Sequence, residues 1–170
     1  MDSESLKVLL NAVCRGDYNA FRLLYEEFKC PVYTVALRLL NNRSDAEEVT
    51  QDVFLKLYYL PADHGIENLR AWVFAVTRNL AVDRIRSRKT VESLDSSVVE
   101  NLYSFDDYSS LDLREVISRL PNRDREILVM HIYGGLRFRE ISDILHIPLG
   151  TVLWRYRKTL TTLRNFMEDE

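Results

Sequence analysis

Three side chains spaced seven residues apart, Trp72, Asn79 and Arg86, lie in the stretch NLRAWVFAVTRNLAVDRIRSRK, residues 68–89. Neither Pro nor Gly interrupts the stretch after Asn68, a residue type that favours helix N-caps, so we expect a single helix roughly 32 Å long. Seven residues are close to two helical turns, and the three side chains therefore line one edge. An aromatic ring, an amide and a guanidinium on one edge can stack on an unpaired base and hold its phosphates.

The same stretch has an apolar face and a cationic C-terminal half. The apolar face comes from residues at helical spacing, namely Leu69, Val73, Val76 and Leu80. The C-terminal half holds one acid, Asp83, among five basic residues: Arg78, Arg84, Arg86, Arg88 and Lys89. Taken alone, these residues favour a solvated amphipathic helix whose cations suit its negative dipole end. The rest of the chain must decide between this interpretation and nucleic-acid binding.

Composition predicts a soluble all-α protein without a metal or cofactor. The 170 residues are 46% hydrophobic and 29% charged, with only 5 Gly and 4 Pro. No apolar run approaches the roughly 20 residues that span a bilayer, so we expect no membrane insertion, and no secretory signal opens the chain. Cys14 and Cys30 lack CxxC spacing, which is typical of reduced thiols in the cytoplasm. The three His residues are scattered, and no nucleophile–base pair or phosphate loop indicates an enzyme.

The formal net charge of −3 is unevenly distributed. Residues 90–113 hold 6 acids and no Lys or Arg, while the flanking segments are nearly neutral. We therefore expect two small helical domains, residues 1–89 and 113–170, joined by an acidic flexible linker over residues 90–112. A chain without excess positive charge should bind duplex DNA weakly by itself and should need a second protein to hold it there.

In the first domain we expect a helix over residues 4–15, a second helix capped by Asp17, and a break at Cys30-Pro31. Ser44 and Glu47 form a predicted capping box that opens a helix running to about Tyr59. This helix turns Val49, Val53, Phe54 and Leu57 inward. Its opposite side is polar, with Asp45, Glu48, Gln51 and Asp52, and by itself that pattern favours a merely solvated face.

The second domain has four predicted helices, over residues 111–120, 122–133, 137–145 and 149–167. The last two are separated by a short turn containing Pro148, which is typical of a helix-turn-helix whose second helix crosses the major groove. Arg155, Arg157 and Lys158 fall off its apolar face. This arrangement favours DNA binding by residues 113–170.

Read together, the motifs resemble those of an extracytoplasmic-function sigma factor, a two-domain bacterial initiation factor. The resemblance runs from about Asp17 to Leu163. It is carried in order by GDYNAFRLLYEEF, SDAEEVTQDVFLKL, NLRAWVFAVTRNLAVDRIRSR, LPNRDREILVMHIYGGLRFREISDIL and IPLGTVLWRYRKTLTTLR. Any one of these motifs is weak, but their combination in this order is specific.

The resemblance implies a cytoplasmic bacterial protein that binds core RNA polymerase and promoter DNA. Docking on the clamp of the largest subunit would use Asp45, Glu48, Gln51, Asp52 and Phe54, and the second domain would dock on the flap of the second-largest subunit. The minus-ten element would be opened and held by Asn68, Leu69, Trp72, Arg78, Asn79, Asp83, Arg84, Arg86 and Arg88, with a flipped base in the loop 63–69. The minus-thirty-five element would be read by Thr151, Trp154, Arg155, Arg157 and Lys158. An anti-sigma factor is a common further partner in the family.

The linker length agrees with two-point promoter contact only if the linker is held extended. Promoter elements two turns apart lie ~70 Å apart, whereas a random coil of this length averages only ~26 Å. Nearly extended, it reaches ~75 Å. In the family it is the polymerase channel that holds it, and an acidic strap can occupy a basic nucleic-acid path without binding DNA.

Two positions depart from the family pattern. His146 stands at a turn position where Gly is usual and where φ is expected to be positive. Leu153 and Trp154 stand where small polar or basic residues usually contact DNA, so Trp154 contacts either thymine methyls and sugars or a protein. Two alternative functions stay open: a stand-alone helix-turn-helix regulator, and a sigma-like coactivator or decoy that reads no DNA.

Overall fold

The structure, a computed structural model, describes residues 1–92 and 111–168, without the side chains of residues 89–92, 111–114 and 167–168. Most of the predicted linker, residues 90–112, lies outside the described residues. The described segments form helices and no strands, as the sequence predicted. The helices are α1 Ser3–Val13, α2 Tyr18–Leu40, α3 Arg43–Tyr58, α4 Leu69–Glu92, α5 Leu111–Arg119, α6 Asn122–Ile132, α7 Phe138–Leu145 and α8 Leu149–Glu168.

The start of α2 agrees with the sequence, but its predicted break at Pro31 is wrong. Asp17 caps the helix by accepting hydrogen bonds from the backbone N–H groups of Asn19 and Ala20. The helix then continues through Pro31 to Leu40. A helix-interior Pro costs about 3 kcal/mol, but the helix keeps an unbroken buried stripe of Leu24, Phe28, Val32 and Val35. Burying one such side chain contributes about 1.5–3 kcal/mol, so the stripe outweighs the cost of the Pro.

The predicted capping box at Ser44 and Glu47 is also wrong. Helix α3 begins two residues earlier, where the Asn42 side chain accepts a hydrogen bond from the Asp45 N–H at 2.9 Å. Glu47 instead pairs with Arg43, with 3.2 Å between Nε and Oε1. The earlier start adds that exposed i,i+4 pair to the first turn, a contribution of about 0.2–0.5 kcal/mol.

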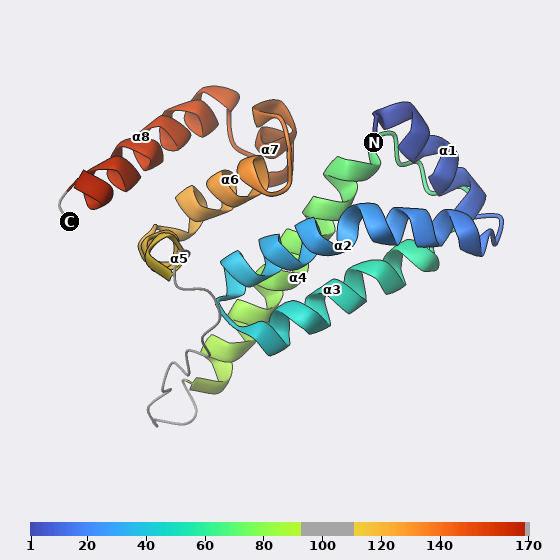
Figure 1. Ribbon diagram of the computed structural model, residues 1–170, viewed down its shortest axis with the longest axis horizontal. Coiled ribbons are helices and arrows are strands. Elements are labelled where there is room, and N and C mark those ends of the chain that lie inside the picture. The colour runs from blue at the N-terminus through green and yellow to red at the C-terminus, as the bar shows by residue number, and fades with distance from the viewer. Residues whose placement is uncertain (93–110, 169–170) are drawn as a thin grey trace.

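Helices α2, α3 and α4 pack side by side around the first core, and α1 packs against α2 and α4 (Figure 1). Phe28 of α2 and Phe74 of α4 are fully buried there and meet edge to face, with ring centroids 6.3 Å apart. The core thereby fixes the rotation of α4, and this rotation decides which of its polar residues point outward.

Helix α6 is buried on opposite sides. Four consecutive residues, Ile127 to Met130, are at most 1% exposed. Because successive helical residues are 100° apart, one partner surface cannot cover all four. Helix α6 packs on α7 and α8 within its own half of the chain and on α2 of the first half, while α7 also touches α4 (Figure 1). The two halves are therefore in direct contact, which the sequence did not predict.

The helix-turn-helix has the predicted form. Helix α7 ends at His146, whose φ of 54° lies in the left-handed region, as expected for a position where Gly is usual. The Ser142 hydroxyl donates to the Ile147 carbonyl at 2.6 Å and closes the turn before α8. Among the described residues, no helix combines the length and the apolar character needed to cross a membrane.

Candidate nucleic-acid interface

The predicted edge of α4 lies at the surface of the first half. Trp72 is half-buried against the core, whereas Asn79 and Arg86 are exposed. Arg78 donates to the Asn79 side-chain oxygen at 3.2 Å, and Arg86 lies 3.9 Å from the Asp83 carboxylate. The ring, the amide and a guanidinium therefore lie along one side of α4, with the amide and the guanidinium exposed.

The N-terminal end of α4 is tied to the second half of the chain. The Asn68 side-chain oxygen caps the helix by accepting from the Ala71 N–H at 3.1 Å, which confirms the predicted cap. Its amide nitrogen donates to Glu140 of α7 at 2.6 Å. Leu69 is only 3% exposed, so in this arrangement it packs in the core and cannot contact DNA. In the preceding loop, His64 Nδ1 accepts from the Ile66 N–H at 2.8 Å.

Arg78, in the middle of α4, is paired with Glu126 of α6. Its Nε and Nη2 atoms lie 3.1–3.4 Å from the Glu126 carboxylate oxygens. The side chains are 16% and 9% exposed, so the pair is largely shielded from water. Arg70, the second residue of α4, bonds to Glu27 at 2.8 Å and reaches the Gly134 carbonyl at 3.4 Å. Several groups on α4 thus contact the second half.

Two further α4 cations, Arg84 and Arg88, contact the acids that were predicted to bind polymerase. Arg84 lies 2.6 Å from Glu48 and 3.9 Å from Asp52, and Arg88 pairs with Asp45. The structure therefore brings two predicted sites together on neighbouring helices, α3 and α4. Each pair is partly exposed, and exposed pairs contribute only about 0–1 kcal/mol.

Two other predicted docking residues lie elsewhere on α3. Gln51 is exposed, while Phe54 is 6% exposed and packs edge to face against Phe21, with ring centroids 6.5 Å apart. Tyr25 also contacts the Phe54 ring, at 4.6 Å between centroids. Phe54 therefore packs beneath the surface of α3. Of these two residues, only Gln51 is accessible from solvent.

On α8, the predicted reading residues divide into two groups. Arg155 donates to Asp124 of α6 at 2.8 Å, and the Asp124 side chain is 7% exposed, so Arg155 holds the recognition helix in place. Trp154 is 58% exposed, with the Lys158 ammonium 5.3 Å from its ring centroid. Arg157 is exposed and Thr151 is half-buried. Trp154, Arg157 and Lys158 consequently form the outward surface of α8.

Four contact residues were missed from the sequence: Asp124, Glu126, Glu140 and Arg70. Only Asp124 and Glu126 had a signal in the sequence, because they stand just before the apolar run of α6. In the structure these two acids are 5% and 6% exposed. A buried carboxylate requires a cationic partner. Sequence position does not identify that partner, which lies 31 or 48 residues away.

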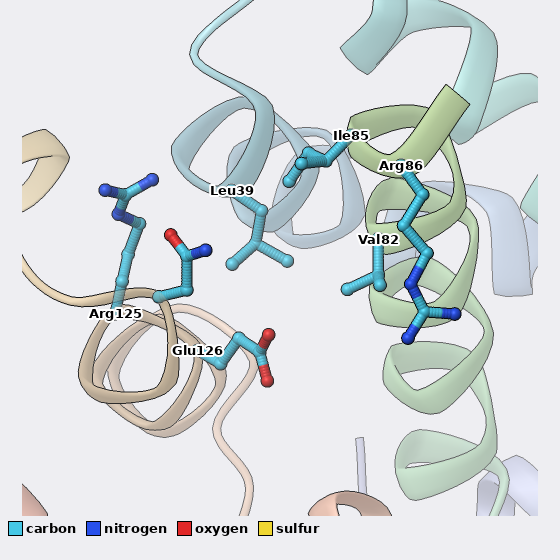
Figure 2. A pocket seen from close by; sticks show the side chains of 7 residues that line it. Leu39, Val82, Ile85, Arg86, Arg125 and Glu126 are labelled. Atoms are coloured by element: carbon cyan, nitrogen blue, oxygen red, sulfur yellow. The ribbon is translucent and has the colours of Figure 1, made fainter. Parts of the chain in front are cut away.

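A small cleft lies where α6 meets α2 and α4. Leu39, Val82 and Ile85 line it from the first half and Glu126 from the second, as Figure 2 shows. Arg125, also in its lining, donates to carbonyls at the end of α5, and burial lowers the pKa of its guanidinium. Among the described residues, no His, Cys, Asp and Glu side chains gather as a metal site would require.

Comparison with known proteins gives the same division of the chain. Residues 24–91 match the family model of Sigma-70 region 2, and residues 110–161 match that of Sigma-70 region 4, which together cover more than half of the chain. The chain is 29% identical to the ECF RNA polymerase sigma factor SigW of Bacillus subtilis, over 96% of this chain and 97% of that protein. It is 26% identical to SigK of Mycobacterium ulcerans, over 98% and 95%.

Two solved structures share the fold. One is the sigma factor RpoE of Bartonella quintana in complex with the anti-sigma factor NepR, with a TM-score of 0.74, 22% identity, and coverage of 87% of this chain and 96% of that one. The other is CnrH in complex with the cytosolic domain of CnrY, with a TM-score of 0.72, 20% identity and 99% coverage of both chains. The ordered region 2 and region 4 matches, with relatives aligned over nearly the full length, place this chain in the family of extracytoplasmic-function RNA polymerase sigma factors.

Proposed function

We propose that this sigma factor works in three steps: α3 docks on the polymerase clamp, α8 contacts the minus-thirty-five element, and α4 holds the opened minus-ten element. In this scheme residues 1–89 and 113–170 are the two working domains and residues 90–112 are the strap between them. The chain acts by binding and performs no chemical catalysis. Its site of action is the cytoplasm, where polymerase is.

The observation that carries the proposal is the edge of α4 within the region 2 match. Trp72 is half-buried and so held in place, while Asn79 and Arg86 project from the same side. Unstacking a base costs a few kcal/mol, and one or two stacking contacts return about 1–3 kcal/mol each. One aromatic side chain with an amide and nearby cations is therefore sufficient to stabilise a short opened segment, but not to melt a long stretch of duplex DNA.

The contacts between α3 and α4 support a coupling between docking and DNA binding. Arg84 and Arg88 are neutralised by Glu48, Asp52 and Asp45 in the free chain. A basic polymerase helix that takes up these acids leaves the two guanidiniums without their partners, next to the reading edge. Phosphates then replace the carboxylates. Polymerase binding would in this way increase the affinity of α4 for DNA.

For the upstream element we assign Trp154, Arg157 and Lys158 as the contacting residues, with Thr151 beside them. All but Thr151 are exposed on α8. A cation beside an indole can hold a phosphate while the ring contacts sugars or thymine methyls. Arg155 is assigned a positioning role because Asp124 engages it.

Relatives of similar fold suggest a further partner. RpoE of Bartonella quintana is bound by an anti-sigma factor, and CnrH by the cytosolic domain of CnrY. We include an anti-sigma protein among the proposed partners of this chain.

Run-off transcription with purified core polymerase on genomic fragments tests the proposal. The complete chain should give discrete transcripts that core enzyme alone does not give, and it should co-elute with core enzyme in gel filtration. Asn79→Ala should remove the transcripts while co-elution persists. The matched control is Asn11→Ala, an exposed Asn on α1 outside both family matches, which should leave transcription unchanged. A wild-type chain that fails to bind core enzyme would refute the scheme.

A further inference from the structure

His131, in the last turn of α6, contacts three separate elements of the second half. Its Nδ1 atom lies 2.8 Å from the carbonyl oxygen of Leu136, in the turn between α6 and α7. Its ring stacks on Phe138, the first residue of α7, and meets Tyr156 of α8 edge to face. One half-buried side chain thus joins the helix-turn-helix to the helix that precedes it.

The turn between α6 and α7 is held against α6 at both backbone polar groups of Leu136. Its N–H donates to the Met130 carbonyl at 3.2 Å. Its carbonyl accepts from His131, whose Nδ1 must carry the proton because a carbonyl oxygen can only accept. At Gly134 a Cβ atom would lie 2.5 Å from the Met130 carbonyl oxygen, so the turn approaches α6 closely. The hydrogen bond from His131 therefore helps to fix where α7 begins.

The rings of His131, Phe138 and Tyr156 form a cluster between α6, α7 and α8. The centroids of the His131 and Phe138 rings are 4.2 Å apart, with 23° between the ring planes. The Tyr156 centroid lies 5.1 Å from that of His131 at 81°, and 4.8 Å from that of Phe138 at 58°. Aromatic rings prefer offset-stacked and edge-to-face arrangements, so the cluster defines the position of Tyr156 relative to both other helices.

Two adjacent residues of α8 are attached to opposite ends of α6. Arg155 binds Asp124 in the first turn of α6 at 2.8 Å, and Tyr156 meets His131 in its last turn. Seven residues separate Asp124 from His131, which places them about 10 Å apart along the axis of α6. Side chains of adjacent helical residues point about 100° apart. The two contacts together therefore restrict the rotation of α8 about its own axis and its angle to α6.

We propose that His131 is a positioning residue for recognition of the upstream promoter element: its ring, through Tyr156, sets the rotation at which α8 faces DNA. The inference rests on the proposed function of α8. Trp154 and Arg157 are exposed and flank the two attached residues in the sequence, so any rotation of α8 moves both of them. His131 touches no DNA in this scheme and acts through the helix that it orients.

Two substitutions separate the ring contacts of His131 from its hydrogen bond. His131→Phe keeps an aromatic ring for Phe138 and Tyr156 but removes the donor to the Leu136 carbonyl. His131→Asn keeps a side-chain N–H donor but removes the ring. If the ring orients α8, the Phe variant should behave like the wild type and the Asn variant should not. Both are compared at a temperature at which circular dichroism shows that they keep their helices.

The orientation of α8 is measured on the complete chain by double electron–electron resonance. Spin labels at Asn122→Cys on α6 and Thr161→Cys on α8 occupy exposed positions, in a background with both native Cys residues changed to Ser. The distribution of distances between the labels should be unchanged in His131→Phe and should broaden or shift in His131→Asn. Ile132→Ala is the control, because it removes an exposed side chain at the next position and should change nothing.

Footprinting of the complex with core polymerase then measures the contact with the upstream element, on a promoter identified by run-off transcription. His131→Phe and Ile132→Ala should protect this element as the wild type does. His131→Asn should weaken its protection about tenfold, a typical effect of losing one contact to a base edge. Protection of the minus-ten element and co-elution with core polymerase should be the same for all of these chains.

Restoration by the Phe variant distinguishes positioning from a merely structural role, in which upstream protection would follow the thermal stability of each variant. Identical label distances in the wild type and the folded Asn variant would overturn the proposal. So would a Phe variant that protects the upstream element no better than the Asn variant does. Failure of the proposed function is a separate outcome, namely absence of run-off transcripts from the wild-type chain with core polymerase, and the label distances do not depend on that assay.

Discussion

Replacing Arg155 with Ala should destabilise the protein more than any other change to a predicted DNA-contacting cation on α8. The Arg155 Nη1 atom lies 2.8 Å from an Asp124 oxygen, and this contact joins α8 to α6. The Asp124 side chain is 7% exposed, so no water can replace the guanidinium without rearrangement. The substitution therefore leaves a buried carboxylate without its cation.

The expected loss follows from these exposures. A hydrogen bond to a charged group contributes about 1.5–3 kcal/mol, and breaking a fully buried ion pair costs about 3–5 kcal/mol. Arg155 is 33% exposed, so solvent already screens part of the attraction. A loss of about 2–3 kcal/mol in the free energy of unfolding is reasonable, which for a chain of this size lowers the Tm by roughly 4–12 °C.

Urea denaturation followed by circular dichroism measures the effect, and Arg157→Ala is its matched control. Arg157 is two residues along the same helix, exposed, and carries the same charge. Its removal should change stability by less than about 0.5 kcal/mol. In the polymerase complex it should instead reduce the salt dependence of DNA binding by about one phosphate contact. Equal stability of the two variants would refute a structural role for Arg155.

Three further predictions use other parts of the chain. Trp154→Ala should leave the Tm unchanged, since the side chain is 58% exposed, and should weaken footprinting protection of the upstream promoter element; unchanged protection would favour a protein partner for this residue. Pro31→Ala supplies an N–H to the interior of α2 and should raise the Tm by the equivalent of up to about 3 kcal/mol, so a lower Tm on a thermal melt would contradict the account of α2. Burial raises the pKa of the Cys14 thiol, so at pH 8 it holds less reactive thiolate, and mass spectrometry should find maleimide on the exposed Cys30 first. Faster labelling of Cys14 would be inconsistent with its burial.

Local features of the fold were largely predictable, because each depends on residues a few positions apart. The caps at Asp17 and Asn68 and the left-handed His146 follow from side-chain chemistry and turn geometry. One local error, the cap of α3, was a choice between two neighbouring residues, Asn42 and Ser44. The other arose where a global term outweighed a local one. At Pro31 the local rule predicts a break, but the buried stripe on both sides of it keeps α2 continuous.

The partners of the candidate site could not be predicted in the same way. Both Arg78 and Arg155 were predicted to contact DNA, yet each is engaged by an acid from another helix. Glu126 lies 48 residues from Arg78, across the acidic segment, and no periodicity relates the two. Arg78 and Glu126 meet only because α6 packs on the first half of the chain.

These pairings also explain how a chain of net charge −3 can be built to bind DNA. Arg78, Arg84, Arg88 and Arg155 each hold a carboxylate. DNA binding is driven by release of the small counterions of DNA when Lys and Arg side chains neutralise its phosphates. A guanidinium that must first leave a carboxylate contributes less to this binding. Free chains should therefore bind DNA poorly. Under the proposed function, a partner that binds the acids of α3 would change the affinity for DNA without touching the DNA itself, and promoter binding would then be conditional on the polymerase.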